Sequence, residues 1–322
     1  MNLEPNYSSI FLSWVALVGG LTLLTAGGEF LVSGAAKLAR RFGMSSLLIG
    51  LTVVAFGTSM PELFVGLIAL LQGHPDILTG NVIGSNIANI GLILGICALI
   101  TPLSVRFRSV SKELYIALIA TIIVFLAAWH GTFPRFLGFI FFISLIIYTA
   151  QSFRLAANNN KNLQEDDPGS AQTDKQTLPA IITVTVIGLA CLPIGSSFFI
   201  NGAIDIARHF GVSELVIGLT LAAVGTSLPE LASCLAAIRQ QHTDILAGNI
   251  IGSNLFNLLM VLGFSGLLMP FPMSSNLLTR DIPIMFSFSA ILLPILVVQH
   301  GLSRLHGFIL LVAYVGYILI LR

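Results

Sequence analysis

Long apolar runs separated by short polar segments dominate the chain from residue 10 to residue 321. Most of these runs approach or exceed the roughly 20 residues that an α-helix needs to cross the hydrocarbon core of a bilayer. The pattern therefore predicts an all-α integral membrane fold with ten membrane-spanning helices. The predicted spans are residues 10–36, 44–71, 77–100, 110–129, 134–154, 179–204, 213–238, 245–268, 283–299 and 306–321.

One long polar stretch interrupts this pattern near the middle of the chain. Residues 156–178 are rich in Asn, Gln, Ser and acidic residues and show no apolar periodicity. Such a composition cannot bury a core, so a solvated linker is predicted. The linker divides the chain into a first half, residues 1–155, and a second half, residues 179–322, with five predicted spans each.

Composition narrows the protein class further. Hydrophobic residues make up 56% of the chain, charged residues 9%, and the net charge is +1. A soluble protein carries about 25% charged residues, so a soluble globular domain is excluded. A net charge of only +1 provides no electrostatic footprint for nucleic acid. The expected partner is the lipid bilayer.

An internal repeat relates the two halves at a fixed offset of 168 residues. Residues 50–95 and 218–263 align without a gap and share 26 of 46 residues, many of them Gly, Thr, Ser, Pro, Glu, Asp and Asn. Five predicted spans, an odd number, separate equivalent points, so the two copies should cross the membrane in opposite directions. Inverted repeats with interrupted helices are typical of secondary transporters, although a channel or an enzyme could also be pseudosymmetric.

Each copy carries the motif GTSxPE inside a predicted span, at residues 57–62 and 225–230. A proline within a helix removes one hydrogen-bond donor and clashes with the carbonyl four residues earlier. The motif therefore predicts a broken helix in each half. We expect backbone carbonyls near Ala55 and Ala223 to be freed and to point inward.

The glutamates of these motifs, Glu62 and Glu230, are the principal candidates for ion binding. A carboxylate near the bilayer centre costs at least ~2.5 kcal/mol, and neither motif span offers a lysine or arginine at similar depth to compensate it. Cations would then supply the compensation. Hydroxyls three and four residues earlier lie on or near the same helix face, namely those of Thr58, Ser59, Thr226 and Ser227.

The following span of each copy adds polar residues in the pattern GNxIGSNxxN. Ser85 and Asn89 are four residues apart and share a helix face, and Ser253 and Asn257 repeat this spacing. The combined set offers only oxygen ligands, which suits Ca²⁺ and Na⁺ and argues against zinc or copper.

Three neighbouring sets of residues are given structural roles. Asn86 and Asn254 are expected to bond freed backbone. Asp76 and Asp244, which open these spans, are expected to cap the helices. Gly80, Gly84, Gly248 and Gly252 form small-residue faces that should allow close helix packing.

Alternatives remain open for the motif residues. The glutamates could be protonated structural acids, the hydroxyls could bond their own helix, and the two serines could simply pack between helices.

Two carboxylates would neutralise one Ca²⁺ or two monovalent ions, and the cost of moving the empty, charged site favours obligate exchange over leak. A cation channel is a further possibility. An intramembrane hydrolase that uses Ser59 or a pair of carboxyl groups is another. No histidine lies within a motif span to activate the serine, but a carboxyl pair could cleave peptides without one.

The paired GTSxPE and GNxIGSN segments, within residues 43–95 and 211–263, resemble the alpha repeats of the cation/calcium exchanger superfamily. The span layout is similar to that of its prokaryotic sodium/calcium exchangers. The resemblance implies an antiporter, not an enzyme, that exchanges Ca²⁺ for Na⁺ without a cofactor, with proton/calcium exchange as the alternative. It implies ion ligation by Glu62, Glu230, Thr58, Ser59, Thr226, Ser227, Ser85, Ser253, Asn89 and Asn257, and by the carbonyls of Ala55 and Ala223. Position 257 is acidic in some potassium-dependent relatives, so Asn257 lowers the expectation of potassium coupling.

The distribution of basic residues predicts the orientation in the cell membrane. With the N-terminus outside, eleven Lys and Arg residues fall in cytoplasmic segments and four fall outside. The positive-inside rule then places both termini outside and the linker in the cytoplasm. We expect a multi-pass protein of the cell (inner) membrane that functions as a monomer.

Overall fold

The computed structural model describes residues 6–166, 177–212, 225–274 and 276–321, without the side chains of residues 156–166. Within these residues, eight helical stretches are long and apolar enough to cross a membrane: 10–42, 46–71, 75–100, 107–129, 135–155, 178–209, 243–268 and 277–299. The tenth predicted span is the shorter apolar helix α16 (Arg304–Ile320). The seventh predicted span is residues 213–238, and its first part, residues 213–224, lies outside the described residues. Its second part corresponds to α12 (Leu228–Arg239).

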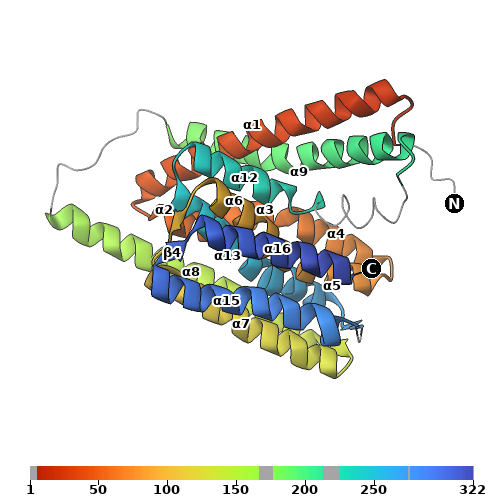
Figure 1. The fold of residues 1–322 in the computed structure, drawn as a ribbon. Coiled ribbons are helices and arrows are strands. Elements are labelled where there is room, and N and C mark those ends of the chain that lie inside the picture. Colours follow the sequence, from red (N-terminus) through yellow and green to blue (C-terminus); the bar gives the residue numbers. More distant parts are fainter. Residues whose placement is uncertain (1–5, 167–176, 213–224, 275, 322) are drawn as a thin grey trace.

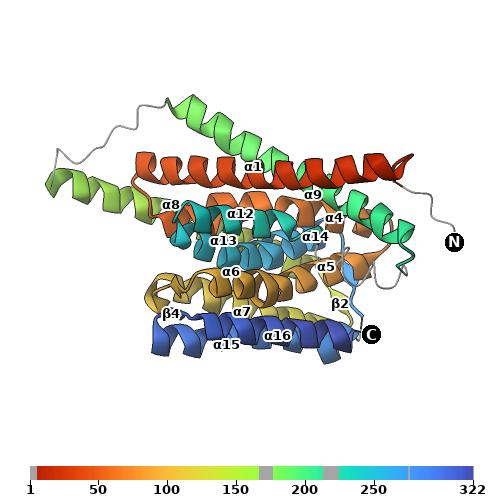
Figure 2. The same ribbon diagram turned by 45° about the horizontal axis from the view of Figure 1, so that its top comes forward.

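Two long helices, α1 (Ile10–Phe42) and α9 (Leu178–His209), lie side by side along one edge of the molecule (Figures 1 and 2). Glycines let them approach backbone to backbone. A Cβ atom at Gly20 would lie 2.4 Å from the backbone nitrogen of Phe199, and one at Gly188 would lie 2.5 Å from that of Leu31. Small residues at such an interface favour close packing in a membrane, where no hydrophobic force drives helices together.

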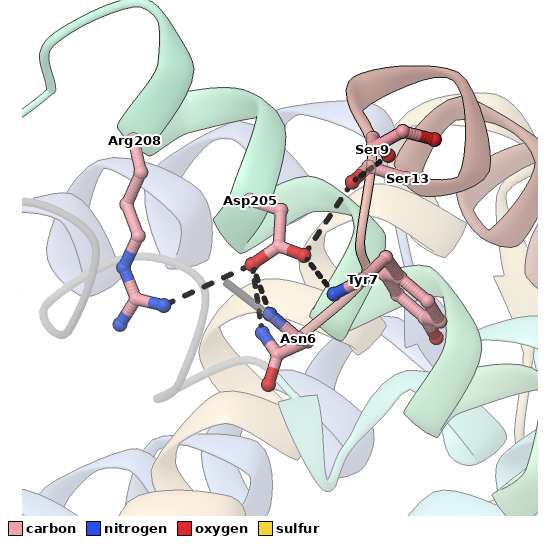
Figure 3. A network of polar contacts seen from close by, with 6 residues as sticks. All are labelled: Asn6, Tyr7, Ser9, Ser13, Asp205 and Arg208. Atoms are coloured by element: carbon pink, nitrogen blue, oxygen red, sulfur yellow. Dashed lines mark hydrogen bonds and ion pairs between the residues drawn. The ribbon is translucent and has the colours of Figure 1, made fainter. Parts of the chain in front are cut away.

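A buried carboxylate fastens the N-terminal segment to the end of α9 (Figure 3). Asp205 accepts hydrogen bonds from the backbone N–H groups of Asn6 and Tyr7, each at 2.9 Å, and from the Asn6 side chain at 2.9 Å. The Ser13 hydroxyl donates at 3.4 Å, and Arg208 forms an ion pair at 3.8 Å. Asp205 is therefore saturated with donors and links the first turn of α1 to α9.

The centre of the molecule is formed by the two motif regions. In the second half, α13 (Thr243–Phe256), the π-helical segment η4 (Asn257–Leu262) and α14 (Gly263–Leu268) form one continuous span, in which residues 245–263 are all buried. Its counterpart comprises α5 (Pro75–Ala88), π-helical η2 (Asn89–Leu94) and α6 (Gly95–Ile100). Before it lie α2 (Ser46–Ile49), π-helical η1 (Gly50–Val54), α3 (Ala55–Thr58) and α4 (Met60–Leu71).

The glycine faces of the two central helices behave differently. A Cβ atom at Gly248 would lie 2.4 Å from the Leu47 carbonyl oxygen, and one at Gly252 would lie 2.7 Å from that of Leu51, so close packing is confirmed in the second half. Gly80 and Gly84 have no such close neighbour among the described residues and line a cavity instead.

The remaining helices, α7 (Phe107–Trp129), α8 (Arg135–Asp166) and α15 (Ile282–Gln299) with π-helical η5 (Leu277–Asp281), pack around this centre. In the described part of the chain, four two-residue strands close the ends of the bundle. Strand β1 (Leu103–Ser104) pairs with β4 (Gly301–Leu302), and β2 (Thr132–Phe133) pairs with β3 (Phe271–Pro272). Figure 2 places β4 and β2 at opposite ends, with the start of α1 and the end of α16 at the β2 end.

The predicted linker needs correction over its first part. Helix α8 does not end near residue 154 but continues to Asp166, as the long free end of the helix in Figure 1 shows. Residues 155–167 contain no Gly or Pro, and the first helix breakers are Pro168 and Gly169. A helix that is already nucleated can extend through such a polar sequence because propagation costs far less than nucleation.

Candidate cation site

Both GTSxPE motifs interrupt a helix, as their prolines predict. Helix α3 ends at Thr58 and α4 begins at Met60, with Ser59 between them at φ −84° and ψ 1°. In the second half Ser227 has nearly the same conformation, φ −86° and ψ 3°, directly before α12. The two breaks therefore place Glu62 and Glu230 in the first turn of a new helix, where the helix dipole favours a negative charge.

The expectation that the break frees the Ala55 carbonyl is wrong. This oxygen accepts a hydrogen bond from the Ser59 backbone N–H at 3.0 Å and lies 3.4 Å from the Thr58 hydroxyl. Because proline lacks a donor only for the carbonyl four residues before it, the group affected by Pro61 is that of Gly57. The matching expectation for Ala223 lies outside the described residues.

Glu62 and Glu230 are fully buried, with 0% of their surface exposed. One carboxylate oxygen of Glu62 lies 3.4 Å from the Ser85 hydroxyl, while its other oxygen and both oxygens of Glu230 have no hydrogen-bond partner. Among the described residues, no lysine or arginine forms an ion pair with either glutamate. Two buried carboxylates without compensation are expensive unless a cation joins them.

Each threonine of one motif contacts the GNxIGSN helix of the other half. The Thr58 hydroxyl donates to the Asn249 Oδ1 at 3.0 Å and lies 3.1 Å from the Ser253 hydroxyl. The Thr226 hydroxyl repeats this arrangement in reverse, since it donates to the Asn81 Oδ1 at 3.0 Å and lies 3.3 Å from the Ser85 hydroxyl. These contacts bring polar residues of both halves together.

Asn81 and Asn249 belong to this arrangement, although the sequence analysis did not select them. Asn81 also donates to the Glu62 backbone carbonyl at 3.2 Å, and Asn249 donates to the Ser233 hydroxyl at 2.8 Å. A signal was present, because each asparagine precedes the motif serine by four residues and therefore shares its helix face.

The other four asparagines of the two motifs bond one another between the halves. Asn86 donates to the Asn254 backbone carbonyl at 3.4 Å, and Asn254 donates to the Asn86 carbonyl at 3.3 Å, which confirms their predicted backbone-bonding role. The Asn89 and Asn257 amides donate to the Asn254 and Asn86 side chains at 3.0 and 3.2 Å. Since η2 and η4 begin at Asn89 and Asn257, the cluster lies where both central helices depart from α-helical hydrogen bonding.

Buried oxygen atoms without a partner are concentrated in these motifs. Among the described residues, eight buried side-chain atoms lack a hydrogen bond, and seven of them are oxygens of predicted ligands. They belong to Ser59, Glu62, Asn89, Ser227, Glu230 and Asn257. Buried polar groups are normally paired, so a concentration of unpaired oxygens is the arrangement that a cation-binding site would need. Carboxylate, hydroxyl and amide oxygens together fit a hard cation such as Ca²⁺ or Na⁺.

A cavity of about 420 Å³ reaches this region, and its lining extends to Leu321, next to the C-terminus. The cavity therefore extends toward the end of the molecule that carries the termini. Asn81, Ser85 and Thr226 lie on its wall, together with Asp76. Asp76 was expected to cap α5, but the cap position is occupied by His74 and Asp76 lies in the first turn. Asp244 is likewise in the first turn of α13, whose cap position is occupied by His242.

Comparison with known proteins agrees with the motif resemblance. Residues 12–154 and 180–322 match the family model described as sodium/calcium exchanger protein. Sodium/calcium exchanger MaX1 of Methanosarcina acetivorans is 32% identical, with 97% of this chain and 99% of that protein covered. Inner membrane protein YrbG of Escherichia coli is 35% identical, with 88% of both chains covered.

The chain also resembles a solved exchanger in three dimensions. The structure of the sodium-calcium exchanger NCX_Mj soaked with Na⁺ and Ca²⁺ matches with a TM-score of 0.81 at 31% identity. The match covers 98% of this chain and 100% of that chain. This multi-pass membrane protein therefore belongs to the sodium/calcium exchanger protein family.

Proposed function

We propose that this chain is a secondary antiporter that exchanges Ca²⁺ for Na⁺ by alternating access. The observation that carries the proposal is the set of seven unpaired, buried oxygen atoms on six motif residues. Glu62 and Glu230 would neutralise one Ca²⁺ or two Na⁺ ions. The serine, threonine and asparagine oxygens around them would replace part of the hydration shell of the ion.

The fold supports an inverted arrangement of two five-helix repeats. Under the 168-residue offset, β1 corresponds to β3 and β4 corresponds to β2, within one residue at each strand. The repeat therefore converts the β1–β4 pair into the β2–β3 pair, which lies at the opposite end of the molecule. An operation that exchanges the two ends is the geometry that alternating access requires, because the same site must open to either side.

The charge balance explains why transport would be coupled. An empty site leaves two buried carboxylates uncompensated, whereas a loaded site is close to neutral. The site can then move between the two faces of the membrane at low cost only with ions bound. Net transport therefore requires ions on both sides. Each chain contains both motifs, which supports a monomer as the functional unit.

The decisive experiment is ⁴⁵Ca uptake into proteoliposomes containing the purified protein. We expect uptake that depends on a Na⁺ gradient in the opposite direction and stops when Na⁺ is replaced by choline. Ca²⁺ uptake that follows its own gradient without any counter-ion would indicate a channel. Uptake driven by a pH gradient and insensitive to Na⁺ would indicate proton/calcium exchange.

A further inference from the structure

A second pair of buried carboxylates lies outside the proposed ion site. Glu113 of α7 and Asp281 at the end of η5 are separated by 168 residues, the same offset that relates the motifs. Their exposed fractions are only 7% and 6%. Ionisable groups buried in a membrane protein are costly, and they commonly mark the path of an ion.

Asp281 is held by a tyrosine and by its own neighbour. The Tyr317 hydroxyl donates to the Asp281 Oδ1 at 3.2 Å. The Arg280 guanidinium donates to the two carboxylate oxygens at 2.9 and 3.1 Å. Arg280 is about one-third exposed, whereas Asp281 and Tyr317 are buried, so the ion pair can be approached from the side of the arginine.

Glu113 also bonds a buried tyrosine and follows a basic residue in the first half. The Tyr148 hydroxyl donates to the Glu113 Oε1 at 3.0 Å. The preceding residue is again basic, and the Lys112 Nζ lies 5.5 Å from the centre of the Tyr148 ring, within range of a cation–π contact. We call each acidic residue and its tyrosine a mouth pair, namely Asp281–Tyr317 and Glu113–Tyr148.

The two mouth pairs belong to opposite ends of the molecule. Glu113 follows the end of β1 by nine residues, and Asp281 follows the end of β3 by nine residues. Because β1 pairs with β4 and β3 pairs with β2, the two strands lie at opposite ends of the bundle (Figure 2). One pair is therefore near each face of the membrane.

The Asp281–Tyr317 pair lies on the wall of the cavity that leads to the candidate site. The described lining of this cavity carries three charged groups, Asp76, Arg280 and Asp281, with charges of −1, +1 and −1 and hence a net charge of −1. A cation entering from the end that carries the termini meets these groups before it reaches Ser85 and Thr226. Clefts lined by charges of one sign raise the local concentration of counter-ions and their rate of entry by about 10–1,000-fold, and this mixed lining with a net charge of −1 corresponds to the lower end of that range.

We propose that the mouth pairs are entry residues for the transported cation, with Asp281–Tyr317 serving the face that carries the termini and Glu113–Tyr148 serving the opposite face. Tyr317 holds the Asp281 carboxylate in the wall of the cavity, and Arg280 balances its charge until a cation arrives. This inference rests on the proposed exchange function, because it assigns the route by which the ions reach that site.

The simpler interpretation is a clamp between neighbouring helices. Tyr317 of α16 and Asp281 of η5 do connect two helices, as do Tyr148 of α8 and Glu113 of α7. A clamp depends on the hydrogen bond and the packing, whereas an entry residue depends on the charge of the cavity wall. The two interpretations therefore respond differently when net charge is changed and then restored.

The test uses three variants of the cavity wall: Asp281→Asn, Arg280→Gln, and the two combined. The net charge of the three groups changes from −1 to 0, to −2 and back to −1. We expect Asp281→Asn to raise the KM for Ca²⁺ on the termini face about tenfold at low ionic strength, and Arg280→Gln to lower it. The double variant should return toward the wild-type KM, and all differences should shrink in high salt as the charges are screened.

Sidedness and a matched control complete the test. Ca²⁺ is supplied to one face at a time, using right-side-out and inside-out membrane vesicles. Glu113→Gln should raise the KM on the face opposite the termini. Asp205→Asn removes a buried acid at the same end as Asp281 but outside the cavity, so it should leave the KM on the termini face unchanged. A double variant with a higher KM than Asp281→Asn, or a rise in KM that is equal on both faces, would establish a clamp and overturn the proposal. Wild-type vesicles without Na⁺-dependent Ca²⁺ flux would instead refute the proposed function.

Discussion

Replacing Glu230 by glutamine should convert the site from one that accepts Ca²⁺ to one that accepts a single monovalent ion. Glu230 is fully buried, both of its carboxylate oxygens lack a partner, and no described basic residue is paired with it. With Ca²⁺ bound, the wild-type site is neutral, whereas the Glu230→Gln site would carry a net charge of +1.

The cost of a charge inside the bilayer sets a lower bound on the loss of Ca²⁺ affinity. An uncompensated charge near the bilayer centre costs at least ~2.5 kcal/mol. At 1.36 kcal/mol for each factor of ten, this corresponds to a loss of at least about 70-fold in apparent Ca²⁺ affinity. One Na⁺ ion neutralises the remaining carboxylate of Glu62, so exchange of Na⁺ for Na⁺ should survive. Glu62→Gln should behave in the same way, because the two glutamates are equivalent under the repeat.

The assay compares ⁴⁵Ca uptake with ²²Na exchange in the same proteoliposomes. Asp205→Asn is the matched control, because it makes the same type of substitution at a buried acid that is saturated by Asn6, Tyr7, Ser13 and Arg208, away from the motifs. Ca²⁺ uptake of near wild-type affinity in Glu230→Gln would refute the reasoning. Loss of both fluxes with a shifted size-exclusion profile would mean that the variant had not folded, and Glu230→Asp would then serve as the second test.

Three further predictions concern orientation, coupling and stability. A single cysteine placed in residues 170–174 should resist an impermeant thiol reagent in intact cells, since the linker is proposed to face the cytoplasm; rapid labelling would reverse the orientation. Acidification should inhibit Ca²⁺ flux because protons compete for Glu62 and Glu230, and replacing K⁺ by choline should have no effect; an absolute K⁺ requirement would contradict this coupling. Asp205→Asn should lower the melting temperature in detergent, since hydrogen bonds to a charged group contribute about 1.5–3 kcal/mol each, and the loss should be smaller in a variant that lacks residues 1–7. Equal losses in both backgrounds would show that Asp205 acts through something other than the N-terminal segment.

Much of the fold follows from the sequence because the bilayer restricts the possible structures. A chain in hydrocarbon must satisfy its backbone hydrogen bonds internally, so apolar runs of sufficient length become helices with few alternatives. The break at Ser59 was predictable for a similar reason, since Pro61 removes a donor wherever the helix lies. The burial of Glu62 and Glu230 followed from their position within these runs.

Contacts between the halves were decided only by the tertiary structure. The sequence grouped Thr58 with Glu62 because they share a helix, whereas the fold pairs Thr58 with Asn249 and Ser253 across 191 and 195 residues. It also directs the Asn89 amide toward Asn254 and leaves its Oδ1 without a partner. Helical spacing determines which side chains share a face, but which face meets which depends on how two inverted units pack against each other. That packing depends on the whole molecule, and for this reason the contacts between the two halves, and the cavity that leads to the candidate site, became visible only in three dimensions.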